Sequence, residues 1–120
     1  MVVHTRKTAN ETLALYANGE RYFFGIDLEN EDFRGAVLVG VSFEYCWMSC
    51  VDFGKAKLAE VSFRNCNVKC ANFAGADLRN AEFGGSAVEA ISLEDANLDG
   101  VSFEGATSYG GVFGKGEMPN

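Results

Sequence analysis

Four cysteines and one histidine are the residues of this 120-residue chain whose types best suit a zinc ion. Thiolates are preferred zinc ligands, so cysteines in pairs are consistent with a zinc site. Cysteines twenty residues apart also raise the alternative of disulfide bonds. We favour a third interpretation for Cys46, Cys50, Cys66 and Cys70, because a free cysteine packs as a compact apolar side chain. The sequence therefore predicts structural thiols, without a metal site or a cofactor.

The residues that could carry out catalysis are scattered. The single histidine, His4, lies close to the N-terminus, in a segment through Thr8 that we expect to be loose. The acidic residues are spread along the chain, and the pattern shows no pocket that would desolvate them. We therefore predict that the protein is not an enzyme.

Charge and composition limit the classes of partner that the protein could bind. The formal net charge is −7, which disfavours direct binding of nucleic acid or an anionic membrane, because phosphate contacts need clustered lysine and arginine. A basic protein partner is compatible with this charge. The chain has no apolar run long enough to span a membrane and no apolar leader of the secretory kind, so we expect one cytoplasmic domain with reduced cysteines.

The elements that must position these residues follow a period of five. From Leu28 to Met118 there are nineteen positions in steps of five; eighteen carry a large apolar residue, and only Ser108 is polar. Nine of the ten phenylalanines share this phase, and Phe24 is the exception. A helix repeats every 3.6 residues and a strand every two, so neither alone explains the pattern.

A second position keeps the same period. Two residues before most apolar centres stands a small residue, such as Val61, Ala71 or Ala76, with Ile91 and the charged Glu31 as exceptions; a mostly polar residue separates the two. Residues two apart in an extended chain point to the same side, so each pentad reads as a very short strand with two inward side chains. The remaining two residues are rich in Gly and Asn, which tolerate the backbone angles of a corner.

The number of pentads in a coil follows from a longer repeat. The tripeptide Val-Ser-Phe recurs at 41, 61 and 101, and the leucine centres 38, 58, 78 and 98 are also twenty apart. Four pentads therefore make one square coil, and the apolar columns fill its interior.

The pentads Ala71–Gly75 and Ala76–Asn80 resemble the pentapeptide repeat family. This resemblance implies an all-β fold, a right-handed quadrilateral β-helix, which we assign to residues 26–118 with four to five coils. Residues 1–25 are expected to form a flexible N-terminus and a short capping helix over Glu11–Ala17, with Asn10 as its cap and Asn18–Gly19 at its end. The family also implies roles without catalysis, and some members protect topoisomerases by imitating DNA.

Two groups of outward residues are candidate binding sites. Trp47 stands where the repeat favours Asp, Asn or Ser, and other large apolar residues lie near it in the coil; the candidate protein-binding residues are Trp47, Tyr45, Tyr22, Phe24, Val37 and Val39. The alternative is that the capping helix covers them. A candidate acidic surface follows the apolar centres of one coil and comprises Glu89, Glu94, Asp95, Asp99 and Glu104, with a merely solubilising role as the alternative.

We favour a non-catalytic protein-binding or scaffold module whose partner is a protein. The alternative is DNA-mimicking protection or inhibition of a topoisomerase such as gyrase, which the net acidity and the family resemblance support. A homodimer through the C-terminal coil or the Trp47 face is a further expectation.

Overall fold

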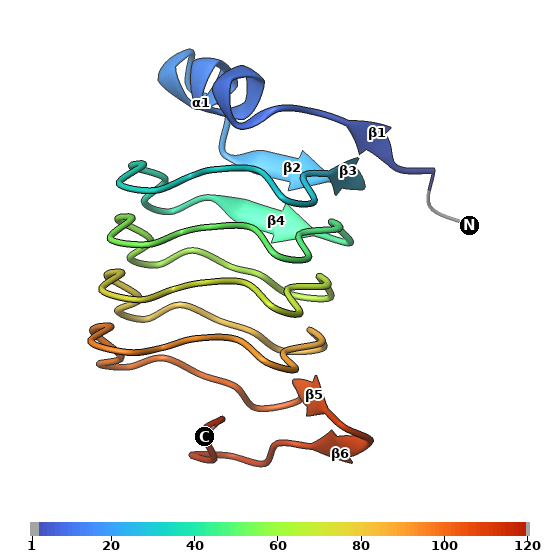
Figure 1. The fold of residues 1–120 in the computed structure, drawn as a ribbon, viewed down its shortest axis with the longest axis vertical. Helices are drawn as coiled ribbons and strands as arrows, with labels where there is room; N and C mark the ends of the chain where they lie inside the picture. Colours follow the sequence, from blue (N-terminus) through green and yellow to red (C-terminus); the bar gives the residue numbers. More distant parts are fainter. Residues whose placement is uncertain (1–2, 120) are drawn as a thin grey trace.

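The computed structural model describes residues 3–119, which form a column of stacked coils with a helix at one end (Figure 1). The elements are β1 (Thr5–Arg6), α1 (Ala9–Ala17), β2 (Tyr22–Phe24), β3 (Ile26–Asp27), β4 (Ser42–Glu44), β5 (Thr107–Ser108) and β6 (Gly111–Val112). The strands pair as β1–β3, β2–β4 and β5–β6. Between β4 and β5 the chain holds its shape through single parallel bridges rather than long strands.

Every bridge outside the named strands joins residues twenty apart, from Asp27 with Trp47 to Ala87 with Thr107. In the inner coils the apolar centre donates its N–H to the coil that follows, as Phe53 does to the Asn72 carbonyl at 2.7 Å. The polar residue before it donates in the opposite direction, as Asp52 does to the Glu31 carbonyl at 3.0 Å. This register confirms the prediction of four pentads per coil.

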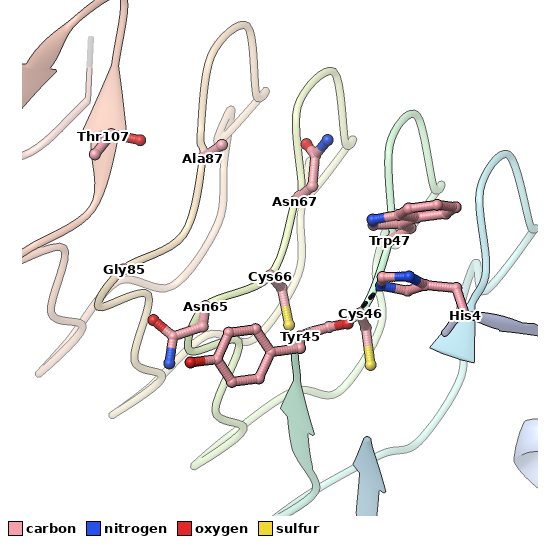
Figure 2. A pocket seen from close by; sticks show the side chains of 10 residues that line it. All are labelled: His4, Tyr45, Cys46, Trp47, Asn65, Cys66, Asn67, Gly85, Ala87 and Thr107. Atoms are coloured by element: carbon pink, nitrogen blue, oxygen red, sulfur yellow. Dashed lines mark hydrogen bonds between the residues drawn. The ribbon is translucent and has the colours of Figure 1, made fainter. Parts of the chain in front are cut away.

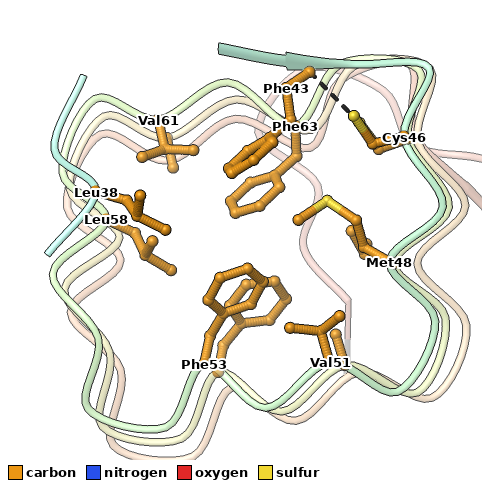
Figure 3. Close-up of a cluster of buried hydrophobic side chains, with 14 of the residues drawn as sticks. Leu38, Phe43, Cys46, Met48, Val51, Phe53, Leu58, Val61 and Phe63 are labelled. Atoms are coloured by element: carbon orange, nitrogen blue, oxygen red, sulfur yellow. Dashed lines mark hydrogen bonds between the residues drawn. The ribbon is translucent and has the colours of Figure 1, made fainter. Parts of the chain in front are cut away.

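The coil has four walls, seen end-on in Figure 3. We number them by their apolar centres: the first wall holds Phe23, Phe43, Phe63, Phe83 and Phe103, the second Leu28, Met48, Val68 and Val88, the third Phe33, Phe53, Phe73 and Leu93, and the fourth Leu38, Leu58, Leu78 and Leu98. Phenylalanines on the same wall stack, with ring centroids 5.0 Å apart for Phe63 and Phe83. Rings of the first and third walls meet edge to face, as Phe53 and Phe63 do at 5.6 Å. Side chains therefore fill the interior.

The corners require a left-handed backbone at every fifth residue. From Gly25 to Gly110 each of these residues has a positive φ, and many of them are not glycine. Asn65 and Cys70, for example, have φ of 57° and 65°. Hydrogen bonds to both neighbouring coils hold these corners in a conformation that most residues avoid.

Helix α1 covers the first coil, but its cap differs from the prediction. Thr8, not Asn10, is the N-cap: its side chain accepts a hydrogen bond from the Glu11 N–H, while the Glu11 carboxylate accepts one from the Thr8 N–H. The Thr8 backbone N–H, followed by the Thr8 side chain, lowers the pKa of the Glu11 carboxyl group. Such a capping box satisfies two backbone donors at once, which Asn10 would not do. At the other end, Asn18 and Gly19 terminate the helix as expected.

The segment before α1 is paired, although the sequence pattern indicated a loose tail through Thr8. Strand β1 lies parallel to β3, with Thr5 opposite Ile26. Arg6 forms an ion pair with Glu31, whose carboxylate also accepts from the Ala9 N–H at the start of α1. Glu31 is the charged exception among the small inward positions, and these contacts explain why a carboxylate stands there. Residues 1 and 2 lie outside the described part of the chain.

The C-terminal end also departs from the expected span of 26–118. Bridges continue only to Thr107, after which β5 turns back into the antiparallel strand β6. The turn residues Tyr109 and Gly110 both have positive φ, as a two-residue hairpin turn requires. Phe113 consequently packs on Phe103 of the first wall, with centroids 6.4 Å apart, instead of stacking on Leu93. At the other end the coil begins at β2, before residue 26.

No helix among residues 3–119 is long and apolar enough to cross a membrane.

Backbone exchange should reveal the open C-terminal edge. The Phe73 N–H donates to the Ser92 carbonyl at 2.8 Å, whereas Leu93 and Leu98 find no backbone acceptor within residues 3–119. Amide hydrogen exchange should therefore be much slower at Phe73 than at Leu98. Equal protection of the two amides, measured residue by residue in the native protein, would contradict this account of the edge.

Two glycine corners form a matched pair for stability. Gly40 and Gly85 have φ of 75° and 74°, but a Cβ at Gly85 would overlap Asn65 Oδ1 of the preceding coil, whereas one at Gly40 would meet no atom within 4 Å. In both variants the alanine must adopt the left-handed backbone conformation, which costs about 1 kcal/mol each. Gly85→Ala should lower the free energy of unfolding by about 1 kcal/mol more than Gly40→Ala, measured by urea denaturation. Equal losses would show that Asn65 moves aside freely.

Candidate functional site

Six apolar side chains are exposed around the end of the column that α1 covers. We call this set the N-terminal apolar surface: Tyr22, Phe24, Val37, Val39, Tyr45 and Trp47, each between 37% and 52% exposed. Strand β2 explains two of them, because its residues alternate and Phe23 points into the core between Tyr22 and Phe24. Tyr45 projects from the corner that follows β4, where φ is 52°.

Three rings of this surface touch one another. Phe24 meets Tyr45 edge to face with centroids 5.7 Å apart, and Tyr22 lies 6.4 Å from Phe24. The parallel pairing of β2 with β4 sets this arrangement and places Phe24 directly opposite Glu44. Burial among these neighbours, followed by the negative charge of Glu44, raises the pKa of Tyr22. The rings therefore stand on a paired backbone that holds them in place.

Trp47 lies on the next wall and has a neighbour that sequence reasoning missed. The His4 ring stacks on Trp47 with centroids 3.7 Å apart and planes 12° from parallel. His4 Nε2 is also 2.8 Å from the Tyr45 carbonyl oxygen, so one side chain joins β1 to both aromatic residues (Figure 2). No local pattern predicts this contact, because forty-one residues separate His4 from Tyr45.

A shallow hollow of about 250 Å³ runs beside Trp47 along the second wall. Small side chains leave this space: Ala87 and Thr107 follow Asn67 in the column above Trp47, and Gly85 lies at the adjacent corner (Figure 2). The bulky residues His4, Tyr45 and Trp47 close one end of the hollow. The surface thus combines a raised aromatic ridge with a depression next to it.

Helix α1 does not cover the apolar surface. Its Ala9, Leu13 and Tyr16 pack on the core instead. The Tyr16 hydroxyl donates to the Val39 carbonyl at 3.2 Å, and the Arg21 guanidinium lies 3.8 Å from the Tyr16 ring centroid. Val37 and Val39 on the fourth wall nevertheless remain 46% and 37% exposed. Packing by the cap therefore accounts for the helix but leaves the six side chains accessible.

The candidate acidic residues do not gather on one face. Glu89, Glu94, Asp99 and Glu104 each follow the centre of a different wall, so they encircle the last coil. Glu94, Asp95, Asp99 and Glu104 are exposed, whereas Glu89 is partly buried and pairs with Lys69 at 3.4 Å. Such a ring spreads its charge in all directions.

The cysteines divide into two kinds. Cys46 and Cys66 are buried, and their thiols approach the Phe23 and Phe43 carbonyls at 3.4 Å, as structural packing predicts. Cys50 and Cys70 are exposed corner residues, so the packing interpretation is wrong for these two. Within residues 3–119, no three His, Cys, Asp or Glu side chains gather as metal ligands would.

Comparison with known proteins agrees with this architecture. The family described as pentapeptide repeat region matches residues 22–93, and the chain belongs to this pentapeptide repeat family. Members of the family form right-handed quadrilateral β-helices. No curated protein matches the chain significantly.

Solved structures of several pentapeptide repeat proteins are similar. One from Nostoc PCC 7120 is 23% identical over 90% of this chain and 83% of its own, with a TM-score of 0.53. One from the thylakoid lumen of Arabidopsis thaliana is 32% identical over 75% of this chain, with a TM-score of 0.51, and the chain spans only 59% of its length. QnrB1, a plasmid-mediated fluoroquinolone resistance protein, is 19% identical over 88% of this chain and 68% of its own, with a TM-score of 0.44.

The stacking of His4 on Trp47 can be tested by fluorescence, because Trp47 is the single tryptophan of the chain. His4→Ala removes the ring that covers one face of the indole. The variant should show red-shifted emission and stronger quenching by acrylamide, since more water reaches the indole. Thr5→Ala, which changes the exposed β1 residue that follows His4, should leave both unchanged. Identical quenching of His4→Ala and wild type would remove the stack from the account.

Proposed function

We propose that this protein is a non-catalytic protein-binding module and that its partner contacts the N-terminal apolar surface. The observation that supports this most is the cluster of Tyr22, Phe24 and Tyr45, whose rings contact one another yet remain about half exposed. Single exposed apolar residues are ordinary on protein surfaces, whereas contiguous exposed patches mark contact sites. Aromatic residues are also the commonest energetic centres of protein interfaces.

Rigidity supports the same proposal. We infer that the column is the right-handed quadrilateral β-helix of its family, in which ladder bonds to neighbouring coils fix each outward residue. Strand β2, which carries Tyr22 and Phe24, pairs with β4 over three residues. A surface that is already ordered loses little conformational entropy on binding, so more of the contact energy contributes to affinity.

Charge indicates the chemistry of the partner. Glu44 lies opposite Phe24, and Glu20 accepts hydrogen bonds from the Arg21 and Tyr22 N–H groups at the same edge. The whole chain carries a net charge of −7. A partner that presents lysine or arginine beside an apolar group would pair with these carboxylates and lie over the aromatic faces. Association should accordingly weaken as salt is added.

The hollow beside Trp47 fits a contact surface better than a catalytic one. It is shallow and open, whereas ligand and active sites are usually concave clefts that enclose most of the bound molecule. Its one imidazole, His4, is already stacked on Trp47 and bonded to a backbone carbonyl. These features support a role without catalysis.

DNA mimicry of a topoisomerase substrate has less support from the same structure. A mimic must present rows of negative charge along one face, as a duplex does. Here Glu89, Glu94, Asp99 and Glu104 surround the last coil, one on each wall, and Lys69 pairs with Glu89. We therefore favour the apolar surface as the place where this protein acts.

Affinity capture from the native host tests the proposal. Wild type and Phe24→Ser should be compared, because Phe24 is the ring that contacts both Tyr22 and Tyr45. A partner retained by wild type should bind Phe24→Ser about tenfold more weakly or worse, the loss typical of an aromatic interface centre. Binding to the purified partner would be measured by calorimetry.

Tyr109→Ser is the matched control, since Tyr109 is an exposed aromatic residue at the opposite end, 82% accessible. It should bind as wild type does. Light scattering of wild type alone would show whether the partner is a second copy of the chain. If Phe24→Ser and Tyr109→Ser retain every partner equally, the apolar surface is not the binding site.

A further inference from the structure

One pair of exposed side chains has no role in the core or in the apolar surface. Cys50 and Cys70 are free thiols at the corner between the second and third walls. Their counterparts Cys46 and Cys66 are buried, and each of those thiols approaches a backbone carbonyl. Exposed cysteines in a column that uses Asn, Gly or Ala at equivalent corners require another explanation.

The ladder places Cys50 directly against Cys70. Bridges join Trp47 to Asn67 before this corner and Asp52 to Asn72 after it, so the register is fixed on both sides. The two cysteines have the same left-handed backbone, with φ of 57° and 65°. Their amides also make equivalent bonds, to the Lys69 and Glu89 carbonyls at 2.8 and 2.9 Å. Two residues with the same conformation in adjacent coils point their side chains in the same direction.

This arrangement lies within reach of a disulfide. Adjacent parallel strands are about 4.8 Å apart, and disulfides join Cα atoms about 4.4 to 6.8 Å apart. The Cβ atoms of a relaxed bridge are about 3.8 Å apart, so the two corners must draw together slightly. Both side chains face solvent, which leaves them room to move and admits a small oxidant.

We propose that Cys50 and Cys70 form a redox-active dithiol site that a low-molecular-weight disulfide oxidises to an intramolecular bridge between adjacent coils. This inference does not depend on the proposed binding function. The neighbours of the pair along the corner are Asn30 and Ala90, neither of which is a thiol or an imidazole. The site is thus a two-thiol site without a third soft ligand in the column.

The reaction proceeds by thiol–disulfide exchange. One cysteine, as the thiolate, attacks a sulfur atom of the small disulfide; a mixed disulfide forms and one small thiolate leaves. The second cysteine then attacks the protein sulfur of the mixed disulfide and releases the second small thiolate. The protons of Cys50 and Cys70 end on the two released thiols. The protein loses two electrons, and the small disulfide gains them.

The surroundings of Cys50 disfavour its thiolate form. The neighbouring Cys70 thiol, followed by partial desolvation at the corner and the negative charge of Glu29, raises the pKa of Cys50. A raised pKa leaves less thiolate, which is the attacking form, so the rate of bridging should increase as the pH rises. Lys69 does not offset this charge, because its ammonium group pairs with Glu89.

The test uses the folded, reduced full-length protein and oxidised glutathione. After incubation, free thiols are alkylated in denaturant, and intact mass and peptide mapping locate each cysteine. We expect a product that has lost two hydrogen atoms, with Cys50 linked to Cys70 and with Cys46 and Cys66 alkylated. A reducing thiol should restore all four thiols.

Two variants distinguish bridging from simple accessibility. Cys50→Ser should accumulate a stable glutathione adduct on Cys70, because the resolving thiol is absent. Cys46→Ala/Cys66→Ala should still form the Cys50–Cys70 bridge. The proposal is overturned if wild type accumulates glutathione adducts on Cys50 or Cys70 without a bridge, forms linked dimers, or stays unmodified. Since the decisive reading is made on wild type, a variant that fails to fold does not affect it.

Discussion

The fixed offset of twenty residues between hydrogen-bonded partners is the constraint on which the rest of this structure depends. Each inner coil both donates hydrogen bonds to its two neighbours and accepts bonds from them, so no coil satisfies its backbone alone. Side chains alternate along each short wall, and a shift of one residue would turn an inward phenylalanine to solvent. Phe53, Phe63 and Phe73 can interlock edge to face only because the offset is preserved from coil to coil.

The same constraint limits sequence variation between coils to the outward-facing positions. Interior positions must be apolar or small, so they differ little from coil to coil, whereas outward positions are limited only by solubility. Trp47 occupies a column that continues as Asn67, Ala87 and Thr107, and Tyr22 occupies one that continues through Ser42. A large ring therefore contributes nothing to closing the coil at these places. Large apolar residues at such outward positions therefore indicate binding sites.

The interior of the column could be predicted because the same residue pattern recurs in every coil. The two ends could not, because each terminal segment has a sequence that occurs only once in the chain. Leu28, Phe43 and Ala76 follow from the period alone. Strand β1, by contrast, is two residues long and too short to show a period, so neither its pairing nor the stacking of His4 on Trp47 could be inferred. Ser108 indicates that the pattern weakens, but the repeat does not predict the tight turn at Tyr109–Gly110. The exposure of the six apolar residues was predicted; the contacts among them depend on strand pairing.

The two ends of the column meet the problem of exposed strand edges differently, and this difference bears on where a partner binds. At the N-terminal end α1 and β1 cover the first coil, and Arg6 and Glu31 tie them together. At the C-terminal end the hairpin shields only part of the last coil, so Leu93 and Leu98 are only partly buried. An apolar surface beside an open edge would promote indiscriminate pairing. Placing the aromatic residues at the covered end separates side-chain recognition from unpaired backbone, which allows exposed rings to be selective.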